Sequence, residues 1–150
     1  MTRIARTFFL TLMCFVLLTP VAARADTPEA TYEDAVLKYT NTERTNRDLR
    51  ALKISTCVDN YAEKQAVRMR AAGKLAHQNM TTIMNGCGLK SVGENIAYGF
   101  PSGKGVVGAW MKSPGHRANI LRGSYRLMGV GAVRDSDGVW WVSQVFGTLK

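Results

Sequence analysis

The sequence predicts an α+β domain in which helices pack on a small antiparallel sheet. Apolar residues recur at helical spacing in the first half of the chain, and the last part holds two apolar runs, 127–134 and 139–146. An Asp-Gly turn at 135–138 joins these runs, and such a turn is a strong signal for a β-hairpin. Helices first and a hairpin last favour segregated helices and strands.

Two helices are expected before the middle of the chain. The first starts at Thr31 and runs to about Asn46, because Asp34 stands three residues after a threonine as a capping-box partner. The second starts after Thr56, and its apolar face continues to Gly73. Glycine at this position is a natural helix C-cap.

The segment 74–104 contains many glycines and is expected to be mostly loop, with one short strand at 95–98. A short helix is expected at 106–111 and another at 114–121. Ser113 would cap the latter, which begins with a proline at its first position.

The first 25 residues have the parts of a cleavable secretory signal. A positively charged start is followed by an apolar run at 8–18 and a small-x-small motif that ends at Ala25, so cleavage is expected before Asp26. The run is shorter than the roughly 20 residues that span a bilayer. We therefore expect an exported domain at 26–150, either extracellular or, in a bacterium, periplasmic or attached to the cell envelope.

The charge of the chain favours contact with an anionic surface. The formal net charge is +9, and three of the arginines lie in the predicted signal, which leaves about +6 for the rest. The positive residues are scattered, an arrangement that suits an anionic envelope surface and peripheral membrane contact. No stripe of aromatic and basic residues accompanies them, so nucleic acid is not an expected partner.

Cys57 and Cys87 are the two cysteines that remain once the signal is removed. An even pair in an oxidising compartment predicts a disulfide. It would close a loop of about thirty residues and stabilise the fold by about 3–4 kcal/mol on the chain-entropy model. The pair has no CxxC spacing, so a metal site built from these cysteines is not expected.

Candidate chemistry lies in the glycine-rich half of the chain. His77 and His116 are the only two histidines of the chain, and Glu94 is the only acidic residue between Lys64 and Arg134. Two imidazoles and one carboxylate form the ligand set of a catalytic zinc site with an open position. The spacing leaves an alternative open, in which the glutamate satisfies loop amides and the histidines have no special role.

Five motifs in fixed order resemble a known family. They are LAH at 75–77, GENIA at 93–97, Trp110 followed by SPGHRANIL at 113–121, GVG at 129–131 and QVFG at 144–147. Together they resemble the CAP superfamily of cysteine-rich secretory proteins, antigens and pathogenesis-related proteins, and most of all its small bacterial branch of SCP-domain proteins. The resemblance covers about 35–147. It implies an α-β-α sandwich and a cleft with two histidines and two glutamates, which in some members holds a divalent metal, often zinc.

The resemblance assigns three of these four positions to His77, Glu94 and His116. The fourth, usually a glutamate, is Ser113 here, and a serine hydroxyl is a poor metal ligand. The expected cofactor is Zn²⁺ or another divalent cation, with Asn95 and Ser113 supporting the cleft. His116 would lie in the first turn of its helix, where the helix dipole disfavours imidazolium and keeps the ring in its metal-binding form.

Three functions stay open at this point. The chain could bind a small-molecule or lipid ligand, a sterol or a cell-wall component; it could be a metal-dependent hydrolase or peptidase in which Glu94 is the catalytic base; or it could be a structural or host-interaction domain. We expect binding rather than catalysis, because the absent second glutamate removes one candidate proton-transfer group. We also expect a monomer.

Overall fold

The computed structural model describes residues 27–150, and a four-stranded sheet with the order β1-β3-β4-β2 lies at the centre of this part. β3 (Leu127–Arg134) and β4 (Trp140–Leu149) form the expected hairpin. β2 (Leu89–Tyr98) pairs antiparallel with β4, whereas β1 (Lys53–Ile54) pairs parallel with β3. The sheet is therefore antiparallel except for a short parallel edge that the sequence did not predict.

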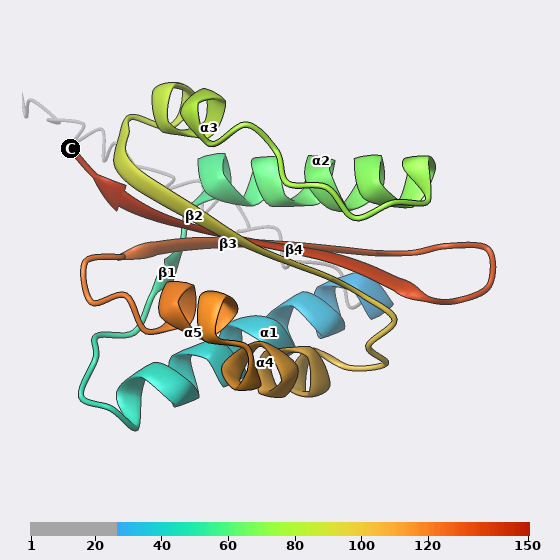
Figure 1. Ribbon diagram of the computed structural model, residues 1–150, viewed down its shortest axis with the longest axis horizontal. Helices are drawn as coiled ribbons and strands as arrows, with labels where there is room; N and C mark the ends of the chain where they lie inside the picture. The colour runs from blue at the N-terminus through green and yellow to red at the C-terminus, as the bar shows by residue number, and fades with distance from the viewer. Residues whose placement is uncertain (1–26) are drawn as a thin grey trace, which may run out of the picture.

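Helices cover both faces of the sheet and give the expected α-β-α sandwich (Figure 1). α2 (Thr56–Ala72) and α3 (Met80–Gly86) lie on one face. α1 (Pro28–Thr45), α4 (Gly103–Lys112) and α5 (Pro114–Ile120) lie on the other. The α+β fold class predicted from the sequence is thus confirmed.

The predicted signal, 1–25, lies outside the described residues. Within the range 27–150, no helix has the length and apolar character needed to cross a membrane.

The first helix begins earlier than the sequence analysis predicted. Thr27 is its N-cap, and the Thr27 side chain accepts a hydrogen bond of 3.1 Å from the backbone N–H of Ala30. Pro28 occupies the first helical position. The predicted start at Thr31, with Asp34 as capping partner, is wrong because a threonine followed by proline is a stronger start signal than a threonine inside the helix.

The expectation of a mostly irregular segment at 74–104 is also wrong. It contains α3, capped by the Asn79 side chain on the N–H of Thr82, and the ten-residue strand β2. β2 reaches back to Leu89 because β4 extends to Leu149 and offers partners along its whole length. Such pairing between distant segments overrides the weak local strand signal of a glycine-containing sequence.

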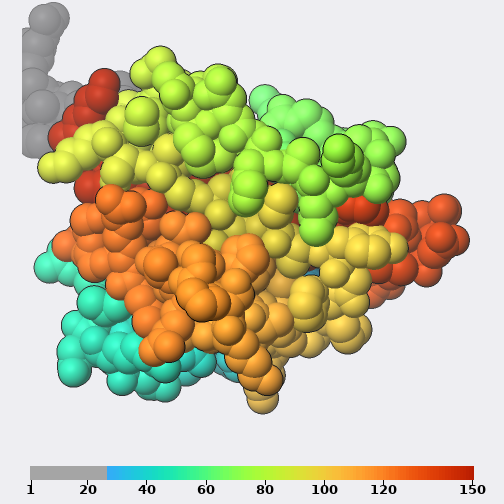
Figure 2. All heavy atoms as spheres, viewed as in Figure 1, coloured from blue at the N-terminus to red at the C-terminus, as the bar shows by residue number. Residues whose placement is uncertain are grey.

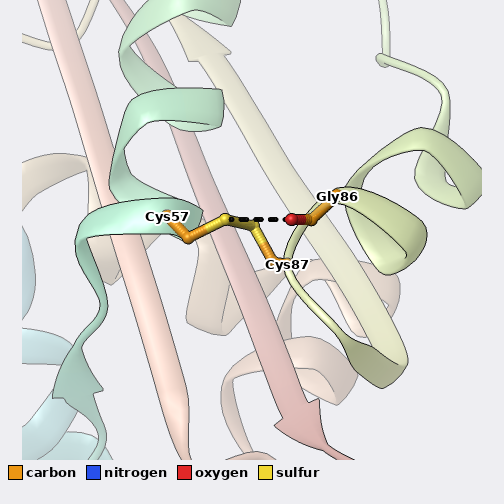
Figure 3. The surroundings of a disulfide bond; sticks show 3 residues. All are labelled: Cys57, Gly86 and Cys87. Carbon is orange, nitrogen blue, oxygen red and sulfur yellow. Dashed lines mark hydrogen bonds between the residues drawn. A yellow bond between two sulfur atoms is a disulfide. The ribbon is translucent and has the colours of Figure 1, made fainter.

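α2 is fixed to its surroundings at two places. Gly129 and Gly131 of β3 face it, and a Cβ atom at either glycine would overlap the helix backbone. At the start of α2, Cys57 forms a disulfide with Cys87, which follows α3, so the two helices of this layer are covalently joined (Figure 3). The predicted disulfide is confirmed, and Gly73 ends the helix in the left-handed conformation as expected.

The sheet separates two apolar cores. The larger one, between the sheet and α1, α4 and α5, includes Trp110 and Phe146. The smaller one, between the sheet and α2 and α3, includes Ile83 and Val145. Because adjacent residues of a strand point to opposite faces, β4 contributes Val145 to one core and Phe146 to the other.

Candidate functional site

Glu94 lies on β2, directly across from Val145 of β4, and its side chain is 1% exposed. Its carboxylate accepts four hydrogen bonds. One oxygen accepts from His77 Nδ1 at 2.7 Å and from the backbone N–H of Gln78 at 3.3 Å. The other accepts from Gln78 Nε2 at 2.7 Å and from the Ser143 hydroxyl at 2.9 Å. A carboxylate offers about four lone-pair sites, so this group is saturated by protein donors.

His77 lies in the segment between α2 and α3, and its side chain is 58% exposed. Because a carboxylate only accepts hydrogen bonds, the 2.7 Å contact with Glu94 places the ring hydrogen on Nδ1 of His77. Nε2 of His77 then carries the free lone pair. The buried glutamate therefore fixes both the tautomer and the orientation of an accessible imidazole.

His116 belongs to α5, in the other helical layer. Its Nδ1 lies 2.9 Å from the Ser113 hydroxyl. Burial, and secondly a coulombic interaction with the nearby His77, lower the pKa of His116 from its ordinary value of 6.5. The expected preference for the neutral ring is thus supported, with burial rather than the helix dipole as its main cause.

Ser113 occupies the N-cap position of α5, as the sequence predicted, but its side chain makes no capping hydrogen bond to the helix backbone. The hydroxyl bonds the ring of His116 instead. The predicted capping interaction is wrong because the imidazole one turn later competes for the same oxygen. Ser113 thereby orients His116 from the position for which the resemblance implies a glutamate.

Two asparagines hold α5 against β2. The Asn95 amide donates to the backbone carbonyl of His116 at 3.2 Å and to Gln144 at 3.3 Å. The Asn119 amide donates to the backbone carbonyl of Glu94 at 3.1 Å and to the Asn95 side chain at 3.0 Å. Glu94 and Asn95 are adjacent on a strand and point to opposite faces, so the strand holds His77 on one side and His116 on the other.

Figure 2 shows this face of the molecule, with α5 in orange and the segment before α3 in green on either side of the yellow β2. His77 bonds Glu94, and the backbone carbonyl of His116 accepts from Asn95, so both histidines lie beside the edge strand β2. In the part of the chain that the structure describes, no three His, Cys, Asp or Glu side chains are grouped closely enough to hold a metal ion.

Sequence reasoning missed three residues of this site. Gln78 and Ser143 are partners of the Glu94 carboxylate, and Asn119 docks α5. Gln78 directly follows a candidate histidine and Asn119 lies in the same motif as His116, so both carried a positional signal. Ser143 carried none, because only the pairing of β2 with β4 brings it near the glutamate.

Comparison with known proteins identifies the family. A model of the cysteine-rich secretory protein family, CAP, matches residues 37–146. The chain belongs to the CAP family. Its sequence is 34% identical over 136 residues to YkwD of Bacillus subtilis, an alignment that covers 86% of this chain and 52% of that protein. The CAP chain thus spans about half the length of this relative.

Solved structures share the fold of this CAP domain. An outer surface protein of Borrelia burgdorferi has a TM-score of 0.71 at 20% identity, over 78% of this chain and 92% of that one. An extracellular protein from Bacillus anthracis that contains an SCP domain has a TM-score of 0.70 at 23% identity, over 84% of this chain and 45% of that one. These likenesses show a shared fold, and membership of the CAP family, expected from the motifs, is confirmed by the family model.

Proposed function

We propose that this chain is an exported CAP domain that binds a ligand at the edge of β2, around His77 and His116, and that it is not a hydrolase. The observation that carries the proposal is that protein donors occupy all the hydrogen-bonding sites of the Glu94 carboxylate. A general base must reach the water from which it takes a proton. The Glu94 carboxylate is buried and already accepts four hydrogen bonds from protein groups, so it orients His77 instead.

The ring nitrogens left without a protein partner support a divalent cation held by two imidazoles as part of the proposal. Nδ1 of His77 is used by Glu94 and Nδ1 of His116 faces Ser113, which leaves Nε2 of each ring for a ligand. Glu94 fits the role of a carboxylate behind a metal-bound histidine, not that of a third ligand. A bound Zn²⁺ would polarise an oxygen of the ligand. Two protein ligands leave further positions for an oxygen-bearing ligand, which suits binding.

The remaining parts of the proposal rest on the sequence. Export follows from the signal predicted at 1–25, and the excess positive charge suits an anionic cell-envelope surface. The ligand class we propose is a lipid, a sterol or a cell-wall component, bound by a monomer. The alternative that a test must separate from binding is a metal-dependent hydrolase in which His77 Nε2 or Glu94 takes a proton from water.

The test combines metal titration with activity assays on the purified, oxidised protein. Zinc binding is measured by calorimetry for the wild type and for His77→Gln, His116→Gln and Glu94→Gln. We expect each histidine variant to lose most of the affinity and Glu94→Gln to lose about tenfold to a hundredfold, as for other groups that orient a ligand. Glu63→Gln, an exposed carboxylate on α2, is the charge-matched control and should bind zinc like the wild type.

The same variants are incubated with peptide, ester and cell-wall substrates, with and without zinc. Binding without turnover is the expected result. Metal-dependent turnover that disappears in Glu94→Gln would overturn the proposal and make the protein an enzyme. Zinc affinity that is unchanged in both histidine variants would remove the metal from the proposal.

A further inference from the structure

A groove of about 420 Å³ runs between α2 and the segment that follows it. This segment leaves the end of α2 and returns beside the helix toward α3 (Figure 1). The volume is within the range of small-ligand sites, about 300–1,000 Å³. His77 lines the groove with its neighbours Ala76 and Gln78, so the groove adjoins the histidine site from the side of α2.

Arg68 presents a fixed guanidinium to this groove. Its Nε and Nη2 donate to the Gln65 side-chain oxygen at 3.0 and 2.6 Å, and Nη2 also donates to the Gln78 side-chain oxygen at 3.3 Å. Both partners are neutral amides, so they orient the guanidinium without neutralising its charge. An arginine with a preset orientation loses less rotamer entropy when it binds a carboxylate or phosphate.

Among the described residues, no ion pair neutralises the positive charge of the groove. Lys74 lines it together with Arg68. Across residues 27–150, no carboxylate lies within ion-pair distance of either side chain. Nη1 of Arg68 also makes no hydrogen bond to these residues. Two cations and free guanidinium donors at one groove complement an anionic group.

The rest of the lining is largely apolar. Tyr61, Ala72 and Ala76 contribute accessible apolar surface to the groove, beside Met69, which is 1% exposed. A small inorganic anion would leave the accessible surfaces of Tyr61, Ala72 and Ala76 in contact with water. A ligand that carries an alkyl or similar apolar chain next to its anionic group would bury them, at about 25 cal/mol per Å² of apolar surface.

Gln78 connects this groove to the histidine site. Its side-chain oxygen accepts from Arg68, and its side-chain nitrogen donates to Glu94 at 2.7 Å. Because one amide holds both Arg68 and Glu94, a group bound at Arg68 lies next to the element that orients His77. The two sites are therefore neighbours with separate charged groups.

We infer that this groove binds an anionic amphiphile, a carboxylate or phosphate attached to an apolar chain, with Arg68 and Lys74 holding the anionic end. The inference rests on the proposed binding function and names a ligand class for it. It requires no metal, since neither cation belongs to the histidine site.

The probes are dodecanoate, dodecyl phosphate, the uncharged dodecanol and inorganic phosphate, titrated below micelle-forming concentrations. The protein variants are Arg68→Gln, Arg68→Lys, Lys74→Gln and, as a matched control, Arg70→Gln. Arg70 lies on the same helix and its substitution removes the same charge, but its guanidinium bonds the backbone carbonyl of Arg134 and does not line the groove. Circular dichroism verifies that each variant is folded.

We expect at least one of the two charged amphiphiles to bind more tightly than dodecanol and inorganic phosphate. Arg68→Gln should lower the affinity for that amphiphile by about tenfold to a hundredfold, the effect of one charge-assisted hydrogen-bonding group. Arg68→Lys and Lys74→Gln should lower the affinity less than Arg68→Gln does. Arg70→Gln should change it by less than about twofold, because a remote charge has only a small effect. A preference between dodecanoate and dodecyl phosphate identifies the anionic group.

Three results would overturn the inference: no binding of either charged amphiphile, equal binding of dodecanol, or equal losses in Arg68→Gln and Arg70→Gln. Zinc titration of Arg68→Gln separates this inference from the proposed function. If the groove is wrong and the histidine site correct, zinc still binds while amphiphile binding is absent or independent of Arg68. If only the metal site is wrong, the binding of dodecanoate or dodecyl phosphate still depends on Arg68.

Discussion

Glu94→Gln replaces one carboxylate oxygen with an amide NH₂ in a nearly identical shape. The amide oxygen can still accept from Gln78 Nε2 and from the Ser143 hydroxyl. The new NH₂ group then faces Nδ1 of His77 and the backbone N–H of Gln78. His77 can move its hydrogen to Nε2 and accept from the amide, but the N–H of Gln78 has no second choice and loses its partner.

The free-energy cost follows from these contacts. A buried N–H without a partner costs about 1–3 kcal/mol, and the remaining bonds lose the extra strength that a charged acceptor gives them. The substitution also removes a charge from a buried position, which offsets part of the lost free energy of unfolding. We expect a net destabilisation of about 2–3 kcal/mol, or a Tm lower by roughly 10 °C for a domain of this size.

Denaturant unfolding of Glu94→Gln, with Glu63→Gln as the exposed control, measures this cost. The control should stay within about 0.5 kcal/mol of the wild type. Long-range ¹H–¹⁵N NMR of His77 should show the ring hydrogen on Nδ1 in the wild type and on Nε2 in Glu94→Gln. An unfolding free energy equal to that of the control, together with an unchanged tautomer, would refute the assignment of Glu94 as the group that orients His77.

Three further outcomes are expected. Reduction of the disulfide should lower the unfolding free energy by about 3–4 kcal/mol, and two titratable thiols in the purified, unreduced protein would contradict the bond. His116 should titrate below pH 6.5, because burial and the coulombic interaction with His77 lower its pKa. On acidification the unfolded chain takes up this proton first, so the free energy of unfolding falls as the pH drops below 6.5 toward the folded-state pKa. In an NMR titration, His77→Gln should raise the pKa of His116 only partway, since burial is the larger cause, and a fully restored value would contradict this order. Gly131→Ala should destabilise the fold by more than about 2 kcal/mol, because its Cβ would overlap the backbone of α2. Gly108→Ala, in open space on α4, should stabilise the fold by about 0.5–1 kcal/mol. Similar Tm values for the two variants would show that α2 does not pack closely on β3.

The sequence by itself determined the features that depend on neighbouring residues. The body of α2 up to Gly73 and the hairpin with its Asp-Gly turn were predictable from caps, turns and periodicity. The disulfide followed from an even cysteine pair in a chain whose sequence predicts a secretory signal. The start of α1 also depends on neighbouring residues, because Thr27 and Pro28 form its helix-start signal. The sequence analysis nevertheless placed this start later. The motifs fixed the family and thereby the three-layer arrangement.

The tertiary structure decided how the candidate residues interact. The partners of Glu94 come from positions 16, 17 and 49 residues away in the chain, and the Ser113 hydroxyl bonds an imidazole rather than the helix it caps. The short strand β1 and the full length of β2 likewise exist because β3 and β4 offer them partners. A buried carboxylate takes its hydrogen bonds from whichever segments are packed around it, and in this protein those segments meet only when the helical layers close on the sheet.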